Sequence, residues 1–414
     1  MLRLSSVMIL SPTVTAALVA LALPATAATA ATANTGPRIA RAGAAASPTV
    51  GGNNDYLQSD SCTSSTFCMA VGAFSPSRRA VGLSEMLSGG RWVAKSVPIP
   101  SRAPNVFANE VSCSSPTRCL FVGDHYLRHH PESNLAEAWN GSSWRIVTMR
   151  NPPFTGFSAL QDVACPTDGF CLVVGLAGVG RRYQGTAYTW TNGKTWHQIA
   201  VPRPRRARNS ELAGLACFSS GDCMAVGNYT SASGRFLPYA DRWHDGRWKL
   251  LTTPAVRNQR FTLFQGISCP SAAQCVAVGN TEDNTRGRFF HAFAEVWSAG
   301  RWRVSTLRRP PSSFFGVSCP ALTRCFASGN TFPSKTTFAR PLIERWNGKT
   351  WMALDPARTS APHSGDVLQH VSCATQTDCE AVGYSFVPGR SNSDKTLAEL
   401  WNGHKWTVQT TPNP

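Results

Sequence analysis

The sequence has no segment of ten or more residues in which apolar side chains recur at the 3.6-residue spacing of an amphipathic helix. This absence excludes helical bundles and folds that alternate strands with helices. The nucleophile-elbow, His-Glu-x-x-His, P-loop and dinucleotide-binding motifs are also missing, which leaves the common hydrolase, metalloprotease and nucleotide-binding classes without support. Acidic residues are few, 23 against 40 basic ones, and only seven of the basic residues are lysine.

Long hydrophobic runs are absent after residue 23. The apolar stretch VTAALVALAL (14–23) follows Arg3 and is too short to span a membrane comfortably. With Pro24 and the small residues ATAATAATA (25–33), it predicts a signal peptide over 1–33, and residues 34–52 read as a flexible leader. We therefore expect a secreted protein, extracellular or associated with the cell wall, that keeps no transmembrane anchor after the signal is cleaved.

All 14 cysteines fall into seven pairs, and five residues separate the two members of each pair. The first cysteines recur every 50 to 54 residues, which indicates a repeat array. The spacing is wrong for zinc, whose cysteine pairs have two to four intervening residues and a second ligand pair nearby. In an exported chain it predicts one local disulfide per repeat: Cys62–Cys68, Cys113–Cys119, Cys165–Cys171, Cys217–Cys223, Cys269–Cys275, Cys319–Cys325 and Cys373–Cys379.

Each repeat also contains four short apolar runs bounded by Gly, Pro, Ser or Asn, such as 264–268, 275–279, 293–297 and the run from Trp302. Their length and composition are typical of strands, and Asn-Gly pairs between the third and fourth runs predict hairpin turns. All 13 tryptophans flank these turns, a placement that indicates packing rather than chemistry. An acidic residue two positions before the first aromatic in six repeats is interpreted as an ion-pair or turn-holding group.

Four strands in about fifty residues is the arithmetic of a β-propeller blade. The predicted fold is all-β: a seven-bladed β-propeller with four antiparallel strands and one disulfide per blade. It fills 53–414 as a single domain, with blades near 53–100, 101–152, 153–204, 205–256, 257–310, 311–358 and 359–414. Blades 1 and 7 each look complete, so we expect the ring to close by packing, without exchange of a strand from residues 34–50.

The excess positive charge is unevenly placed. Loops expected on one rim, those between strands 2 and 3 and between blades, carry an excess of about 15 positive charges, against about 4 on the other rim. A face with one sign of charge attracts polyanions, although a solvated surface without a partner is the alternative. The clusters are Arg78, Arg79, Arg181, Arg182, Arg203, Arg205, Arg206, Arg208, Arg308 and Arg309.

The repeat resembles kelch-type propellers in its strand-two glycines, such as Gly72 and Gly279, and in its paired aromatics. The segment NGKTW at 192–196 and 347–351 is similar to the end of the Asp-box of sialidase-like propellers, without the aspartate. The whole of 53–414 resembles the secreted, Cys-paired propeller-repeat proteins of actinobacteria. These resemblances imply a propeller fold, and the sialidase-like one implies a glycan-active hydrolase or lyase as an alternative function.

Two positions on the expected innermost strands are candidates for ligand binding at the channel mouth. Four residues before the first cysteine stand the amides Asn109, Gln161, Gln265 and Gln369, which either satisfy buried backbone groups or hold a polar ligand. At the next position the repeat breaks, and Glu110, Asp162 and His370 come from blades 2, 3 and 7. Two carboxylates and an imidazole can bind a cation or perform acid–base chemistry, and the structural alternative is solvated side chains.

The preferred hypothesis is a secreted, non-catalytic propeller whose basic rim recognises an anionic polysaccharide, teichoic acid or another polyanion, or a cell-surface glycan. We expect no catalytic residue, metal or cofactor, no specific reading of nucleic acid sequence, and a monomer. The sequence does not identify the ligand, the cleavage site or an activity. An enzyme should gather its non-repeating polar residues in one pocket, whereas a binder should spread charge over a rim.

Overall fold

The computed structural model places Val50–Pro414 in one compact unit, and all that follows concerns this unit. It describes residues 54–77, 79–100, 105–126, 132–149, 152, 156–254, 256, 259–283, 290–305, 311–332, 339–359, 364–390 and 393–413. The predicted signal peptide and leader therefore lie outside the described residues. No helix occurs in these ranges, and so none that could span a membrane.

Twenty-eight strands follow one another in seven units of four (units 1 to 7), and within each unit the strands pair antiparallel in sequence order. The first strands are β1 (Tyr56–Ser64), β5 (Asn105–Ser115), β9 (Phe157–Thr167), β13 (Asn209–Ser219), β17 (Gln259–Ser271), β21 (Ser312–Ala321) and β25 (Gly365–Thr375). The second strands are β2 (Phe67–Ser77), β6 (Arg118–Tyr126), β10 (Phe170–Val179), β14 (Asp222–Thr230), β18 (Gln274–Asp283), β22 (Arg324–Thr331) and β26 (Asp378–Phe386).

The third strands are β3 (Arg79–Ser88), β7 (Ser133–Trp139), β11 (Arg182–Thr191), β15 (Phe236–His244), β19 (Phe290–Ser298), β23 (Arg340–Trp346) and β27 (Lys395–Trp401). The fourth are β4 (Arg91–Lys95), β8 (Trp144–Ile146), β12 (Thr195–Ile199), β16 (Arg247–Leu251), β20 (Arg301–Ser305), β24 (Trp351–Leu354) and β28 (Trp406–Gln409). The predicted strand runs are thus present, and each is longer than its apolar centre because pairing continues into the polar flanks.

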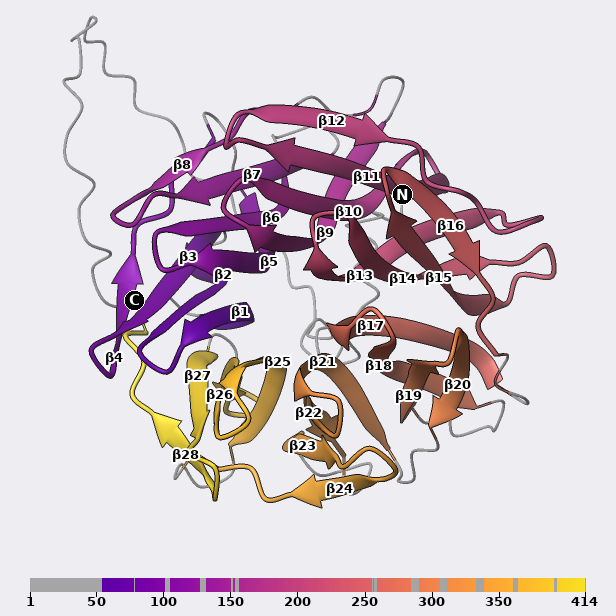
Figure 1. Ribbon diagram of the computed structural model, residues 1–414. Helices are drawn as coiled ribbons and strands as arrows, with labels where there is room; N and C mark the ends of the chain where they lie inside the picture. The colour runs from indigo at the N-terminus through magenta and orange to yellow at the C-terminus, as the bar shows by residue number, and fades with distance from the viewer. Residues whose placement is uncertain are drawn as a thin grey trace, which may run out of the picture. The chain divides into compact units, whose positions relative to one another are not determined.

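The first strands contact one another in ring order, from β1 to β5 and onward to β25, and β25 contacts β1 (Figure 1). This is the arrangement of a β-propeller. Units 4 and 5 share one eight-stranded sheet, because a single parallel bridge joins Phe236 of β15 to Phe261 of β17. The described residues therefore form six hydrogen-bonded sheets in seven units, and no sheet runs continuously round the ring.

The apolar core lies between neighbouring units. One buried cluster, for example, combines Leu120 and Val122 of unit 2 with Leu160 and Val163 of unit 3. The tryptophans pack as the sequence predicts: Trp139 and Trp144 are cross-strand partners whose ring centroids are 5.5 Å apart. Rings of this size at a fixed register bury a large apolar area at each interface between units.

All seven predicted disulfides are present, one per unit, with Cα atoms 3.9–4.1 Å apart. The five residues between two paired cysteines do not all form a loop, and the strands do not end at the cysteines. The strands continue past them to a tighter turn, so that Cys113 pairs with Cys119 and Ser115 pairs with Arg118. Each disulfide therefore joins facing residues inside a hairpin, where cross-strand side chains are close enough for the bond.

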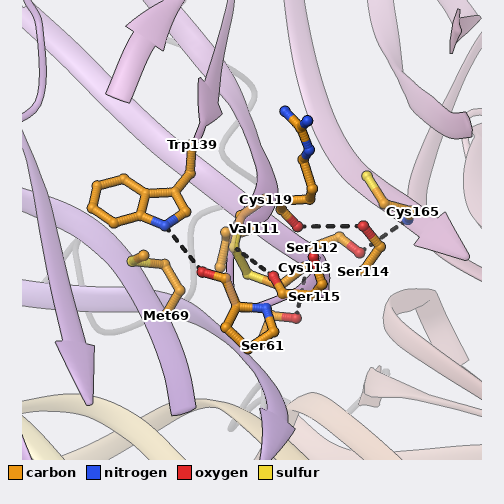
Figure 2. The surroundings of a disulfide bond; sticks show 12 residues. Ser61, Met69, Val111, Ser112, Cys113, Ser114, Ser115, Cys119, Trp139 and Cys165 are labelled. Atoms are coloured by element: carbon orange, nitrogen blue, oxygen red, sulfur yellow. Dashed lines mark hydrogen bonds between the residues drawn. A yellow bond between two sulfur atoms is a disulfide. The ribbon is translucent and has the colours of Figure 1, made fainter. Parts of the chain in front are cut away.

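A serine before the first cysteine links each of five units to the next. Figure 2 shows two of these contacts, in which Cys113 N donates to Ser61 Oγ (3.0 Å) and Cys165 N donates to Ser112 Oγ (2.9 Å). The set comprises Ser61, Ser112, Ser268, Ser318 and Ser372, and we call it the serine ladder. Units 3 and 4 have Ala164 and Ala216 at this position.

The last unit meets the first through the same kind of contact. Cys62 N donates to Ser372 Oγ (2.9 Å), and Asp55 N donates to the Asp394 carbonyl oxygen (3.2 Å), next to a single parallel bridge at Asn54. Units 1 and 7 each hold four strands of their own. The described contacts thus join units 1 and 7 by packing and isolated hydrogen bonds. Residues 34–50, which were expected not to supply a strand to the last unit, lie outside the described residues.

The repeated acidic residues of the third strands differ from expectation. Glu85, Glu137, Asp241 and Glu295 are fully buried, and no basic side chain pairs with them among the described residues. Burial raises the pKa of Glu85, Asp241 and Glu295 to about 8 and that of Glu137 to about 9. A carboxyl group with this environment is protonated at neutral pH, so these residues are not ion-pair partners.

Candidate functional site

The basic rim is formed where two arginine-containing loops meet. Arg181 and Arg182 are exposed at the turn between β10 and β11, and Arg203, Arg205, Arg206 and Arg208 are exposed in the connection from β12 to β13. The two loops lie side by side, because Tyr183 N donates to Asn209 Oδ1 (3.2 Å) and Gly185 N donates to Ser210 Oγ (3.4 Å).

The side chains of the other predicted rim residues are not described by the structure. Arg78, Arg308 and Arg309 lie outside the described residues, as does the side chain of Arg79. The predicted rim arginines whose side chains the structure describes are those in the loops of units 3 and 4.

Arg203 has a different role from its neighbours. Its guanidinium group donates to the carbonyl oxygen of Ala207 and, at 2.7 Å, to that of Arg208. A third bond closes the same loop, from Ala207 N to the Pro204 carbonyl oxygen (3.0 Å). Arg203 thus fixes the loop that displays Arg205, Arg206 and Arg208, and Arg206 is exposed there at a φ of 60°, in the left-handed region.

The two loops contain no acidic residue, in contrast to the opposite rim. On that rim Arg242 makes a bidentate ion pair with Asp222, with Nε–Oδ1 at 2.8 Å and Nη2–Oδ2 at 2.5 Å. Asp168 there accepts a hydrogen bond from Ser114 (2.6 Å). Charges on the disulfide side are therefore locally mixed, whereas the arginines of units 3 and 4 are not neutralised by a carboxylate in their own loops.

A cavity of about 370 Å³ also opens on the disulfide side, between units 2 and 3. Trp139, Trp190, Arg118 and Arg145 are among the residues that line it. Arg145 donates to the Gly193 carbonyl oxygen (3.0 Å). Arg145, one of the two arginines named here, thus already has a hydrogen-bond partner within the protein.

The channel-mouth residues do come together, at the point where units 7, 1, 2 and 3 meet. His370 Nδ1 lies 2.9 Å from Asp60 Oδ1, and His370 Nε2 lies 3.8 Å from Glu110 Oε1. Ser59 Oγ donates to Glu110 Oε1. On the far side, three glycines replace these side chains, and a Cβ on Gly316 would lie only 2.9 Å from the His370 Cα, so the strands there pack backbone to backbone.

The carboxylates of this cluster are largely committed to the backbone. Asp162 Oδ1 accepts from its neighbour Val163 N (2.5 Å), and Asp162 Oδ2 accepts from Leu215 N of the next unit (2.6 Å). Glu110 Oε1 accepts from Val111 N (3.2 Å). The bond from Leu215 N joins two adjacent first strands, and the other two satisfy an amide of the same strand, so all three have a structural function.

Burial and mutual charge set the protonation of the cluster. Burial raises the pKa of Asp60, Glu110 and Asp162, and repulsion from Glu110 raises that of Asp162 further. For His370 burial lowers the pKa, but Glu110, Asp60 and Asp162 together raise it to about 9. The imidazolium thus balances the nearby carboxylates, and the group of acids and histidine behaves as one coupled network.

The predicted amides lie on a β-bulge. The pairing register slips at this position in every first strand, between Ala108 and Glu110 in unit 2, for example. Asn109 Nδ2 donates to the Leu160 carbonyl oxygen of the next unit (2.8 Å) and to Asp124 Oδ1 (3.2 Å), while Gln369 is buried and Gln161 and Gln265 are half-buried. For Asn109 the structure therefore favours the structural alternative over a ligand role.

Sequence reasoning missed two groups. Asp60, whose Oδ1 lies 2.9 Å from His370 Nδ1, stands one residue after the two positions that the sequence suggests as candidates. The serine ladder is visible as the dipeptide Ser-Cys in five units and Ala-Cys in two, a signal that needs only an alignment of the repeats. Among the described residues, no group of three or more His, Cys, Asp or Glu side chains could hold a metal ion.

Comparison with known proteins adds a general likeness of fold. No family model matches the sequence, and no curated protein matches it. Similar solved structures include the β-propeller domain of the Trilobed protease from Pyrococcus furiosus (8% identity, 87% of this chain and 99% of that chain, TM-score 0.48). Others are YCF48 from Cyanidioschyzon merolae (13%, 83% and 98%, 0.47) and the Hadza microbial sialidase Hz136 (11%, 74% and 71%, 0.44). At this level of similarity the comparisons assign the chain neither a family nor an activity.

Proposed function

We propose that the chain is a secreted, seven-bladed propeller that binds an anionic polymer without transforming it. The polymer would bind the basic patch, which we define as Arg181, Arg182, Arg205, Arg206 and Arg208. The observation that carries the proposal is the pairing of two acid-free loops, which places five exposed guanidinium groups on one part of one rim.

The chemistry of the patch suits phosphate, sulfate or carboxylate groups. Guanidinium presents planar donor pairs that bind such oxyanions in a bidentate manner, and it remains charged at any physiological pH. Several cations displayed on a fixed loop lose less side-chain freedom on binding than cations on a mobile one. The contacts of Arg203 provide that fixation.

The alternative of a glycan hydrolase or lyase has less support. A glycosidase needs two carboxyl groups that are free to donate a proton or attack. Asp162 uses both oxygen atoms to accept backbone N–H groups, and Glu110 shares one oxygen among Ser59, Val111 and the histidine. The non-repeating polar residues therefore gather as the sequence hypothesis required of an enzyme, but they are occupied in joining strands.

The cellular setting follows from the cysteines. Seven disulfides and no free cysteine among the described residues indicate an oxidising environment. Together with the N-terminal sequence and the resemblance to secreted, Cys-paired propeller-repeat proteins, this supports secretion and an extracellular or cell-wall polymer as partner.

The test is binding of inorganic polyphosphate at two salt concentrations, measured by competition against a fluorescent polyanion. Wild-type affinity should fall steeply as salt rises, because each contacted phosphate releases counterions. The variant with Arg181→Ser, Arg182→Ser, Arg205→Ser, Arg206→Asn and Arg208→Ser should bind at least about tenfold more weakly and show a flatter salt dependence. Asparagine is chosen at 206 because it tolerates the left-handed backbone.

A matched control removes five exposed charges from the opposite rim: Arg91→Ser, Lys194→Ser, Arg247→Ser, Arg301→Ser and Lys405→Ser. Both variants lower the net charge from +17 to +12. The control should keep nearly all of the affinity. Equal losses would show attraction by net charge alone, and no polyphosphate binding at low salt would reject the proposal.

A further inference from the structure

A row of phenylalanine rings continues the basic rim from unit 4 into unit 5. Phe236 begins β15, Phe261 lies in β17 and Phe290 begins β19. The ring centroids are 6.3 Å apart from Phe236 to Phe261 and 5.7 Å apart from Phe261 to Phe290. Phe236 is 39% exposed and the other two are half-buried, so the row forms a partly solvated apolar strip.

The strip is contiguous with the basic patch. Arg208 N donates to the Thr230 carbonyl oxygen (2.7 Å), and Thr230 is the cross-strand partner of Phe236. Phe236 in turn bridges to Phe261 through the parallel link between units 4 and 5. Three successive backbone contacts thus run along one rim from Arg208 of the basic patch to the residues that carry the rings.

The fold itself does not account for these rings. In units other than 4 and 5 the third strand begins with Arg79, Ser133, Arg182, Arg340 or Lys395, all polar. The three phenylalanines also take no part in the buried clusters of the described residues of units 4 and 5. Phe236 and Phe290 thus stand partly in water where the other third strands begin with a polar residue. With Phe261 between them they form a contiguous apolar patch, which is typical of an interaction site.

A basic patch next to three phenylalanine rings suits some polyanions better than others. Teichoic acids and acidic polysaccharides offer anionic groups and hydroxyl groups, but no flat aromatic surface that would benefit from three phenyl rings. Single-stranded nucleic acid offers both anionic groups and flat aromatic surfaces. Its phosphates bind cationic grooves, and its bases stack on aromatic side chains without regard to sequence. Anionic lipid would suit protruding apolar anchors better than a strip in which two of three rings are half-buried.

We propose that the polyanion is single-stranded nucleic acid, with its phosphates on the basic patch and adjacent bases stacked on Phe236, Phe261 and Phe290. This inference rests on the proposed function and names its polymer. It predicts no preference for sequence, because phenyl rings supply no hydrogen bonds to base edges.

The experiment compares a labelled oligothymidylate with an abasic oligomer of the same length and charge, by fluorescence anisotropy at low salt. Wild-type protein should bind oligothymidylate more tightly than the abasic oligomer. The variant Phe236→Leu/Phe261→Leu keeps the strip apolar but removes two rings. It should lose about fivefold or more of its affinity for oligothymidylate and bind the abasic oligomer as before.

The outcomes separate the inference from the proposed function. Equal wild-type affinity for both oligomers, or an unchanged affinity of the Phe variant for oligothymidylate, overturns the inference and leaves polyphosphate binding intact. Vesicle binding that depends on the two rings, without oligothymidylate binding, would reassign the strip to anionic lipid. The single variant Phe236→Leu, at the most exposed ring, gives the same decision if the double variant melts below the assay temperature.

Discussion

At the scale of single residues, short polar side chains join the units as much as apolar packing does. Each serine of the serine ladder accepts a hydrogen bond from a backbone N–H of the next unit. Two residues earlier in the strand, a channel-mouth side chain can make the same kind of bond: Asp162 accepts from Leu215 N of the next unit. Because an unsatisfied buried amide is costly, these small groups hold adjacent first strands at a fixed separation.

Removal of one acceptor at the closing interface should therefore be measurable. Ser372→Ala leaves Cys62 N without its partner and should lower the free energy of unfolding by about 1–2 kcal/mol in urea titrations. Ser268→Ala, which removes the equivalent bond at a mid-ring interface, is the matched control and should cost about the same. A loss at Ser268 with none at Ser372 would show that the ring does not close through this contact.

At the scale of the element, the stabilised unit is the hairpin of the first two strands. Its disulfide lies within the paired region, two residues before the end of the first strand and one residue after the start of the second. The neighbouring turn residues contact the second hairpin of the same unit: a Cβ on Gly141 would lie 3.0 Å from the Thr117 side chain. The glycine at φ 96° thus allows the two turns of one unit to touch.

The double variant Cys269→Ser/Cys275→Ser should destabilise the protein by about 2 kcal/mol, the chain entropy of a short closed loop. Urea titration monitored by tryptophan fluorescence would measure the loss. The far-ultraviolet circular dichroism spectrum should be unchanged, because the strands on both sides keep their pairing. Non-reducing peptide mapping of the wild type should show only links between cysteines six positions apart, and a link between units would contradict the structure.

Much of this element-level structure could be predicted from the sequence, and the reasons for the failures are physical. Cysteine spacing and tryptophan register repeat in nearly every unit, so they identify strands and disulfides without an alignment of relatives. The protonation of Glu295 and of the equivalent acidic residues in other units could not be predicted from the repeat pattern. The sequence does not show whether a cation or an apolar interface surrounds a carboxyl group. The clamp role of Arg203 likewise depends on loop geometry, and the Phe236 row depends on a bridge between units.

At the scale of the whole molecule, the buried carboxyl groups set the dependence of stability on pH. Burial raises the pKa of Glu137 and Glu380 to about 9 and that of Glu399 to about 8. It also raises the pKa of Glu85, Asp241 and Glu295 to about 8. In the unfolded chain the glutamates titrate near 4.5 and Asp241 near 3.8. Between these values the folded state binds more protons than the unfolded state.

The melting temperature should accordingly fall as the pH rises from about 5 towards 9. Stability from a raised carboxyl pKa is fully present below the unfolded value and is lost as the pH passes through the folded one, and the raised pKa of His370, about 9, acts in the same direction. Calorimetry across this range would measure the fall. A melting temperature that rises from pH 5 to 8 would contradict the assigned protonation.

A single substitution isolates the effect. Glu295→Gln keeps the shape of the neutral acid and should flatten the fall between pH 6 and 9, with little change at pH 5. Asp245→Asn is the control, because it makes the same change of acid to amide in a side chain that is 84% exposed. Identical pH profiles for Glu295→Gln and wild type would exclude Glu295 as a contributor.

The local pairing of the cysteines has a consequence for how the protein oxidises as it is made. Each second cysteine follows its partner by six residues, while the next pair lies more than forty residues further along the chain. Loop-closure entropy strongly favours the near partner, so thiols that oxidise in the order of synthesis reach the native set without isomerisation. A chain built in this way would depend little on a disulfide-shuffling catalyst, and it would acquire its covalent bonds before the ring could close.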